Sequence, residues 1–207
     1  MFLHEIMKGA DPSHLAFTGE VDVTYGALED AIHRYRNAIY ALGVREGERV
    51  SLYSANRAEF VYAFMAVVSL GAIIVPVNNS LVDREVDYIL KDSGSTLLIT
   101  DTPMDVSVPS ISIEELDEKS HEPLPEAPDF PASLTEDDVC ALIYTSGTTG
   151  SPKGAMLTHK NLVRNVEQFT ARIIFKPEDK VLCVLPMFHC YGMTTIVHGS
   201  LYAHSTI

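Results

Sequence analysis

The sequence predicts an α/β fold in which a mostly parallel sheet is flanked by helices on both faces. Short apolar runs alternate along the chain with longer segments of helical periodicity, which is the pattern of parallel strands covered by helices. These runs are continuously apolar, as expected for strands that are buried on both sides. With 207 residues, of which 46% are hydrophobic, the chain can bury about 70% of its unfolded surface.

Three segments in the first half of the chain predict helices. Apolar residues recur at helical spacing over residues 25–42, and the Thr24 side chain can cap the first turn. Residues 58–70 are apolar almost all round, as in a helix buried within a larger body. Residues 83–91 again follow a helical pattern, and Asp83 is expected to cap this third helix.

Strands are expected at the short apolar runs. These runs cover residues 49–53, 73–77, 96–100, 139–144 and 181–185. Two further helices are predicted in the second half of the chain, over residues 161–174 and from residue 191 to about residue 202, because apolar residues recur there at helical spacing.

Residues 114–138 are rich in proline and acidic side chains and show little periodicity. We interpret them as a Pro-rich acidic connecting loop within one α/β body that spans residues 1–207. A domain boundary at this point is the alternative. One body is favoured because the run 139–144 is so apolar that it needs cover from both sides.

The most distinctive segment is residues 142–154, Leu-Ile-Tyr-Thr-Ser-Gly-Thr-Thr-Gly-Ser-Pro-Lys-Gly. Its glycines let the backbone approach a ligand with the N–H groups turned inward, its hydroxyls can donate to phosphate oxygens, and its lysine adds a positive charge. The pattern therefore predicts a polyphosphate-binding loop for ATP. The residues expected to bind it are Thr145, Ser146, Gly147, Thr148, Thr149, Gly150 and Lys153.

Other phosphate-binding patterns do not account for this segment. A Walker A loop requires Gly-Lys-Ser/Thr before a helix, but Pro152 stands in place of the glycine and Gly154 follows Lys153. The next residues, 155–157, predict a short strand, so the loop is expected to join two strands. No Gly-x-Gly-x-x-Gly occurs in the chain, which gives a dinucleotide fold no support. A flexible surface loop is the alternative, although such loops seldom lie between apolar strands.

Residues 144–154 resemble the signature of the AMP-binding, adenylate-forming superfamily. This group includes acyl-CoA synthetases, aryl-CoA ligases, luciferases and the adenylation domains of peptide synthetases. Further segments resemble other blocks of the family, in the family's order, and together they cover roughly residues 20 to 207. They are Thr24-Tyr25-x-x-Leu28, Gly47-Glu48-Arg49-Val50 with Asn56, the run 71–78 (Gly-Ala-Ile-Ile-Val-Pro-Val-Asn), and Leu185-Pro186-Met187-Phe188-His189-x-x-Gly192.

The resemblance implies a reaction in which a carboxylate attacks the α-phosphate of ATP, acyl-AMP forms and pyrophosphate leaves. A thiol, usually that of coenzyme A, then displaces AMP. Lys153 is expected to neutralise phosphate charge. His189 is expected at a strand end facing a cleft, where it positions the carboxylate substrate. An ordinary solvated lysine and a structural histidine are the alternatives. Met187 and Phe188 are candidates for an acyl pocket, with plain core packing as the alternative.

The resemblance also places several family elements after Ile207. These are the adenine- and ribose-binding blocks, the acidic ligand for Mg²⁺, and a mobile C-terminal domain with its catalytic lysine. We therefore expect the chain to be the N-terminal part of a larger enzyme and to be inactive alone. The activity expected of the complete enzyme is that of a fatty-acid–CoA ligase. An aryl-acid–CoA ligase, an amino-acid-adenylating domain, an isolated nucleotide-binding module and a scaffold with a degenerate loop are the alternatives.

The composition of the chain narrows the range of binding partners and cellular locations that we expect. The formal net charge of −13 disfavours nucleic-acid binding, which requires basic surface. The three cysteines lie in or beside apolar runs, which predicts buried thiols in a reducing compartment rather than disulfides or a zinc site. Residues 1–8 lack the apolar core of a signal peptide. The uncharged run 61–77 is shorter than the ~20 residues of a spanning helix. A cytoplasmic protein with no transmembrane segment is expected, and peripheral membrane contact is compatible with the sequence.

Overall fold

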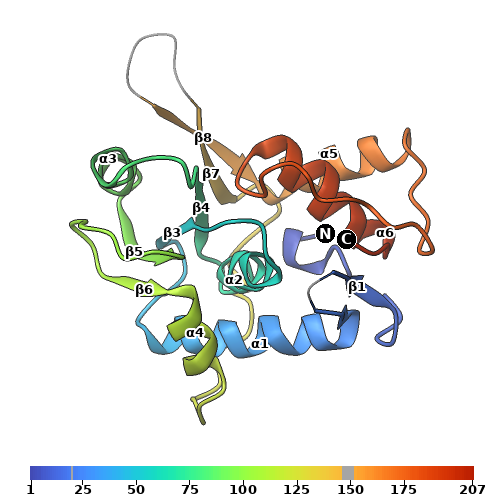
Figure 1. Ribbon diagram of the computed structural model, residues 1–207, viewed down its shortest axis with the longest axis horizontal. Coiled ribbons are helices and arrows are strands. Elements are labelled where there is room, and N and C mark those ends of the chain that lie inside the picture. Colours follow the sequence, from blue (N-terminus) through green and yellow to red (C-terminus); the bar gives the residue numbers. More distant parts are fainter. Residues whose placement is uncertain (20, 146–151) are drawn as a thin grey trace.

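The computed structural model of the protein describes residues 1–19, 21–145 and 152–207, and its centre is a six-stranded sheet (Figure 1). The strand order is β6-β5-β3-β4-β7-β8. All neighbouring strands are parallel except β7 and β8, which are antiparallel. The strands are β3 (Arg49–Tyr53), β4 (Ile73–Val77), β5 (Ser95–Thr100), β6 (Ser110–Ser112), β7 (Val139–Thr145) and β8 (Lys153–Thr158). A separate two-stranded sheet pairs β1 (Leu15–Phe17) with β2 (Val23–Thr24).

Helices cover both faces of the large sheet, which confirms the predicted fold class. Alternate strand residues enter two different cores: Val50 and Leu52 of β3 belong to the larger one, whereas Tyr53 belongs to the smaller. The larger core lies under α1, α2, α4 and α5, and α3 closes the smaller core on the opposite face. The helical elements are η1 (Leu3–Glu5), α1 (Tyr25–Ala41), α2 (Ala58–Ser69), α3 (Asp83–Ser93), α4 (Ile113–Ser120), α5 (His159–Thr170), the π-helical η2 (Gly192–His198) and α6 (Gly199–Ala203).

The first three helices form where periodicity predicts them. The Thr24 hydroxyl accepts a hydrogen bond from the Ala27 amide at 3.2 Å and so caps α1. Every α2 residue from Phe60 to Ser69 is buried, in agreement with its apolar character on all sides. The prediction that Asp83 caps α3 is wrong. Val82 occupies the cap position, and its amide donates to the Glu85 carboxylate three residues later.

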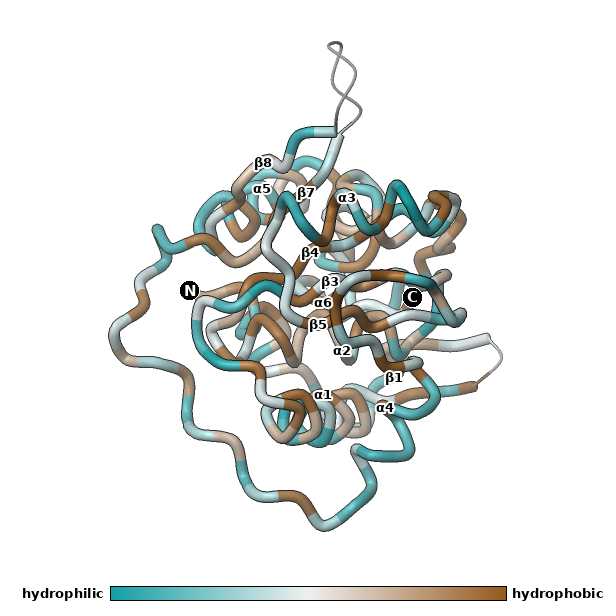
Figure 2. Tube along the Cα trace, turned by 90° about the vertical axis from the view of Figure 1, so that its left-hand side faces the viewer, coloured by the Kyte–Doolittle hydropathy of each residue, from teal (hydrophilic) through white to brown (hydrophobic). Residues whose placement is uncertain are grey.

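Residues 114–138 are not wholly a loop, because α4 occupies the start of this range. The Ser112 hydroxyl accepts the Glu115 amide and so starts that helix. The remaining connector, residues 121–138, is a long loop that runs around the outside of the fold (Figure 2). Two α1 residues fasten it: the Asn37 side chain accepts the Ala127 amide at 2.9 Å, and Arg36 donates to the Ala127 carbonyl at 3.2 Å.

Two predictions in the second half of the chain need correction. Helix α5 ends at Thr170, because the hydroxyl of that residue bonds back to the Val166 carbonyl at 2.8 Å and the following residues, including Ile174 at 75% exposed, find no core to enter. Residues 181–185 form no strand, in contrast to the prediction. Their ladder contact is limited to the bridge beside Lys180, where the Val181 amide donates to the Thr206 carbonyl. The helix predicted from residue 191 is present as η2 followed by α6.

Candidate active-site cleft

The predicted phosphate-binding segment spans the turn of the β7–β8 hairpin, so it joins two strands as the sequence predicts. Thr145 at the end of β7 pairs in register with Lys153 at the start of β8, and both side chains are exposed. The other predicted ligands lie outside the described residues: Ser146, Gly147, Thr148, Thr149 and Gly150. Among the predicted ligands, the described ends of the hairpin therefore carry one hydroxyl and one cation.

Helix α3 supports the base of the hairpin. The Tyr144 hydroxyl donates to the Asp92 carboxylate at 2.6 Å, and the Tyr88 hydroxyl donates to the Pro152 carbonyl at 3.4 Å. Desolvation, followed by the bond to Asp92, raises the pKa of Tyr144, so its phenol stays protonated and remains a donor. A Cβ atom at Gly154 would lie 3.0 Å from the Tyr144 ring. The glycine after Lys153 thus leaves room for this tyrosine.

A cleft of about 300 Å³ lies beside the hairpin and is lined by two of the predicted site residues, Thr145 and His189, but not by Lys153. Thr145 and Pro152 line it from the hairpin, and Asn78 lines it from the end of β4. Phe188 and His189 line it from the segment that precedes η2. Residues more than forty positions apart in the sequence, Thr145 and His189, therefore border one cavity. We call it the hairpin cleft.

His189 faces this cleft from a turn, and not from the end of a strand as predicted. Its amide donates to the Pro186 carbonyl at 3.1 Å, and its own carbonyl accepts the Met193 amide at 2.9 Å. Its imidazole Nδ1 accepts the Tyr191 amide at 3.2 Å. In the neutral ring this leaves the proton on Nε2. The exposed imidazole can therefore offer a hydrogen-bond donor to an acceptor such as a carboxylate oxygen.

The residues beside His189 have different environments. Phe188 lines the cleft, whereas Met187 is 3% exposed and belongs to the larger core. The Cys190 thiol is exposed and lies 3.9 Å from the His189 Nδ1. All three cysteines are free, but only Cys140 is buried as predicted, since Cys183 is half-buried and Cys190 faces solvent. Apolar neighbours in the sequence predicted burial, but the turn before η2 carries Cys190 outward.

Sequence reasoning missed other residues that line the cleft. Leu81 and Ile89 form part of its apolar wall, and Tyr144 reaches it from β7. Asn78 gave the clearest signal, because it is a polar residue directly after a buried strand. Leu81 lies in the loop before α3, and the contribution of Ile89 depends on how α3 lies across the sheet, which its helical periodicity does not indicate.

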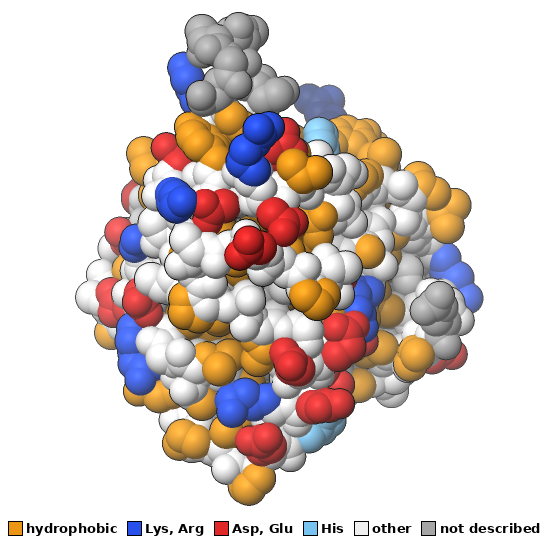
Figure 3. All heavy atoms as spheres, turned by 60° about the vertical axis from the view of Figure 1, so that its left-hand side comes forward, with side chains coloured by type: hydrophobic (Ala, Val, Ile, Leu, Met, Phe, Trp, Pro, Cys, Tyr) orange, Lys and Arg blue, Asp and Glu red, His pale blue; other side chains and the backbone are white. Residues whose placement is uncertain are grey.

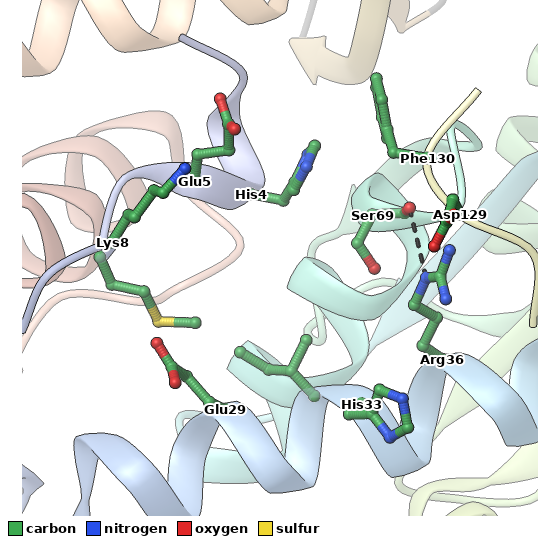
Figure 4. Close-up of a pocket in the computed structure, with 11 residues that line it drawn as sticks. His4, Glu5, Lys8, Glu29, His33, Arg36, Ser69, Asp129 and Phe130 are labelled. Atoms are coloured by element: carbon green, nitrogen blue, oxygen red, sulfur yellow. Dashed lines mark hydrogen bonds between the residues drawn. The ribbon is translucent and has the colours of Figure 1, made fainter. Parts of the chain in front are cut away.

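A larger hollow of about 430 Å³ lies along α1 and contains none of the predicted site residues (Figure 4). Two of its basic groups, Arg36 and His33, are already engaged. Arg36 donates to the Ser69 carbonyl at 3.4 Å and to the Ala127 carbonyl, and His33 contacts the Glu126 carboxylate at 2.5 Å. Because these groups hold the connector against α1, we do not place the active site in this hollow.

The described residues contain no group of three or more His, Cys, Asp or Glu side chains arranged to hold a metal ion. No helix of the described ranges is both long enough and apolar enough to cross a bilayer. On the face shown in Figure 3, acidic and basic side chains are interspersed and do not gather into one basic patch. That distribution offers nucleic acid no basic track on this face.

Comparison with protein families matches residues 7–207 to the family described as AMP-binding enzyme. The chain belongs to this family. Among curated members, it is 34% identical over 197 residues to a feruloyl-CoA synthase of Amycolatopsis sp, with 91% of this chain and 39% of that protein covered. It is 32% identical over 194 residues to the long-chain-fatty-acid–CoA ligase FadD13 of Mycobacterium tuberculosis, with 88% and 39% covered. The chain thus spans about two-fifths of the length of these relatives.

Solved structures of other AMP-binding enzymes share the fold. Apo MatB from Rhodopseudomonas palustris superposes with a TM-score of 0.88 at 25% identity, covering 100% of this chain and 44% of that one. The o-succinylbenzoate coenzyme A synthetase MenE from Bacillus subtilis, in complex with AMP, gives a TM-score of 0.87 at 30% identity, covering 99% and 54%. The fold is therefore that of the N-terminal region of an adenylate-forming enzyme.

Proposed function

We propose that the chain is the N-terminal part of an acid–thiol ligase that activates a carboxylic acid with ATP and transfers the acyl group to coenzyme A. The observation that supports this is the shared cleft. The hairpin end, with Thr145 and Lys153, lies beside the same cavity as His189. One side of the cleft thus suits a polyphosphate and the other suits a carboxylate, which are the two reactants of acyl-AMP formation.

The proposed roles follow from charge. A carboxylate and a triphosphate repel each other, so the enzyme must offset negative charge where pyrophosphate departs. The Lys153 ammonium and the Thr145 hydroxyl do this at the hairpin, together with Ser146, Gly147, Thr148, Thr149 and Gly150. His189 donates from Nε2 to the carboxylate and holds it for in-line attack on the α-phosphorus. A cation this close to the reacting groups acts locally, despite the net charge of −13.

Mg²⁺ and coenzyme A complete the proposed set of ligands. The described residues offer no ligand group for the metal, so we derive no step through it. Its ligand and the coenzyme A site are proposed to lie in the remainder of the enzyme, which is also where relatives have the other three-fifths of their length.

We propose a fatty acid as the substrate, with an aryl acid as the second candidate. The apolar wall of the hairpin cleft, formed by Leu81, Ile89, Ile143 and Phe188, suits a hydrocarbon substituent. The relatives favour both candidates, since one is a long-chain-fatty-acid–CoA ligase and another a feruloyl-CoA synthase. An amino acid fits this wall less well, because its ammonium group would need a partner there.

The test is acid-dependent exchange of labelled pyrophosphate into ATP, measured with the complete enzyme against a panel of fatty, aromatic and amino acids. Fatty acids are expected to give the highest kcat/KM. Highest exchange with aromatic acids would replace the fatty-acid assignment, and no exchange with any acid would refute the proposed activity. The 207-residue chain alone is expected to give no acyl-AMP, because it would act only as a nucleotide-binding module without the rest of the enzyme. Acid-dependent pyrophosphate release from this chain would refute that expectation.

The contribution of His189 is tested in the same assay. His189→Ala should raise the KM for the acid more than the KM for ATP, because the residue lies on the carboxylate side of the cleft. His121→Ala is the matched control, since His121 is an exposed histidine on the connector. Equal acid KM values for the two variants would contradict the role of His189.

A further inference from the structure

The turn that carries Phe188 and His189 into the cleft has little backbone support of its own. Residues 181–185 form no strand, and Leu182 and Val184 are 79% and 70% exposed. Backbone bonds within the segment are local, from the Val184 amide to the Leu182 carbonyl and from the His189 amide to the Pro186 carbonyl. Something other than a sheet ladder must fix where this segment lies.

The side chain of Asn56 supplies that support. Its Oδ1 accepts the Met187 amide at 2.7 Å, and its Nδ2 donates to the Leu185 carbonyl at 2.8 Å and to the Cys183 carbonyl at 3.4 Å. The Asn56 side chain thus accepts from a backbone amide after Pro186 and donates to backbone carbonyls before it. An asparagine can do this because its side chain offers an acceptor and two donors in one plane.

Asn56 is itself held at a fixed place in the fold. It follows β3 directly, in the loop that leads into α2. The amide of the preceding Ala55 donates to the Asp101 carboxylate at 2.6 Å, so the loop is attached to the end of β5. On the other side of the contact, Met187 anchors the turn by entering the larger core. The bonds from Asn56 therefore tie the cleft-lining turn to the loop after β3, an interior strand of the sheet.

We propose that Asn56 is a positioning residue for the carboxylate side of the hairpin cleft. It touches no substrate in this assignment. It sets the distance between the turn 186–189 and the sheet, and thereby the place of Phe188 and His189. The proposal rests on the proposed function for its kinetic consequence, but the structural consequence can be measured independently of any activity.

The first measurement is hydrogen exchange of the complete protein, comparing Asn56→Ala with wild type. The Met187 amide should lose protection at least about tenfold, as expected when its bond of ordinary strength is removed. The matched control is Asn37→Ala. The Asn37 side chain, on α1, also accepts a distant backbone amide, but that of Ala127 in the connector. The control should leave Met187 protection unchanged. Unchanged protection in Asn56→Ala would overturn the proposal.

The second measurement is the KM for the acid and for ATP in pyrophosphate exchange. Asn56→Ala should raise the acid KM about 5- to 20-fold, as for the loss of two hydrogen bonds, and change the ATP KM less than about twofold. Asn56→Asp keeps the acceptor for Met187 and loses the donors, so its acid KM should fall between those of wild type and Asn56→Ala. Lost protection with an unaltered acid KM, or equal rises in both KM values, would overturn the proposal. If wild type exchanges with no acid, the proposed function fails, and hydrogen exchange still decides whether Asn56 holds the turn.

Discussion

A buried histidine in η2 makes the stability of this protein depend on pH. His198 is 1% exposed and stacks edge-on against the Phe64 ring at 5.2 Å. Its Nδ1 has no hydrogen-bond partner among the residues described. Burial lowers the pKa of His198 to about 3 from the ordinary value of 6.5. The unfolded chain therefore binds a proton at a higher pH than the folded chain does, and stability must fall as pH decreases below 6.5.

The size of this effect follows from linkage. At pH 7.5 an unfolded histidine is mostly neutral, and its protonation lowers the free energy of unfolding by less than about 0.1 kcal/mol. At pH 5.5 the unfolded histidine is almost fully charged, and the cost is about 1.4 kcal/mol. At pH 4.5 it is about 2.7 kcal/mol. These values depend on the unfolded pKa and hardly on how far the native pKa is lowered, because the folded imidazole is neutral throughout this range.

The assay is urea unfolding of the 207-residue chain at pH 7.5, 6.5 and 5.5, for wild type and His198→Leu. The variant should lose about 1.3 kcal/mol less than wild type between pH 7.5 and 5.5. A difference in unfolding free energy between the two proteins at pH 7.5 reports the change in packing against Phe64. Subtracting it leaves the pH-dependent part of the difference. His121→Leu removes a histidine that is exposed in the folded state and serves as the control. If wild type and His198→Leu lose the same free energy over this interval, the argument from burial is wrong.

Three other perturbations test the site and its support. Lys153→Ala in the complete enzyme should weaken ATP binding by about 1.5–3 kcal/mol through loss of one charge-assisted contact; an unchanged ATP KM, with Lys160→Ala as the control, would count against its role. Tyr144→Phe removes the hydrogen bond to α3 and should lower the free energy of unfolding by about 1–2 kcal/mol, and an equal urea midpoint would show that the bond contributes nothing. Gly192→Ala places a Cβ atom in conflict with the Pro186 carbonyl oxygen and should both destabilise the protein and raise the acid KM; wild-type values of both would refute the close approach.

The local sequence pattern was sufficient to predict an element where the residues that cause it to form are its neighbours in the sequence. The run 49–53 is β3 to the residue, and the α2 segment is buried all round as its composition indicates. The hairpin too could be predicted, because a loop bounded by apolar runs on both sides needs two strands. The prediction for residues 181–185 failed because a strand is defined by its partner, and an apolar run carries no information about whether a partner lies beside it.

The candidate site residues could be proposed from sequence motifs, whereas the residues that support them could not. Lys153 and His189 stand in motifs that a single sequence displays. Asn56, in contrast, acts on residues more than a hundred positions away. Its role depends on the pairing of β3 with β4 and β5, which brings the loop after β3 against the turn before η2. Side-chain bonds of this kind follow from topology, so they emerge only once the strand order is known.

The proposed function requires a chain with a net charge of −13 to hold a polyanion, and the position of the cleft bears on this requirement. Asn56 follows β3, Asn78 follows β4, and Thr145 ends β7, so three neighbouring parallel strands direct their carboxyl ends to the same edge of the sheet. Ligands of open parallel sheets bind at this edge, where loops rather than strands set the chemistry. Asn78 and Thr145 line the cleft with an amide and a hydroxyl, and Lys153 is the register partner of Thr145 at the start of β8. Because salt screens the interaction between exposed charges beyond about 8–10 Å at physiological ionic strength, acids farther than this from the cleft affect a ligand there much less than the groups that line it. Local geometry at the sheet edge, and not the net charge, therefore decides which ligand this protein can bind.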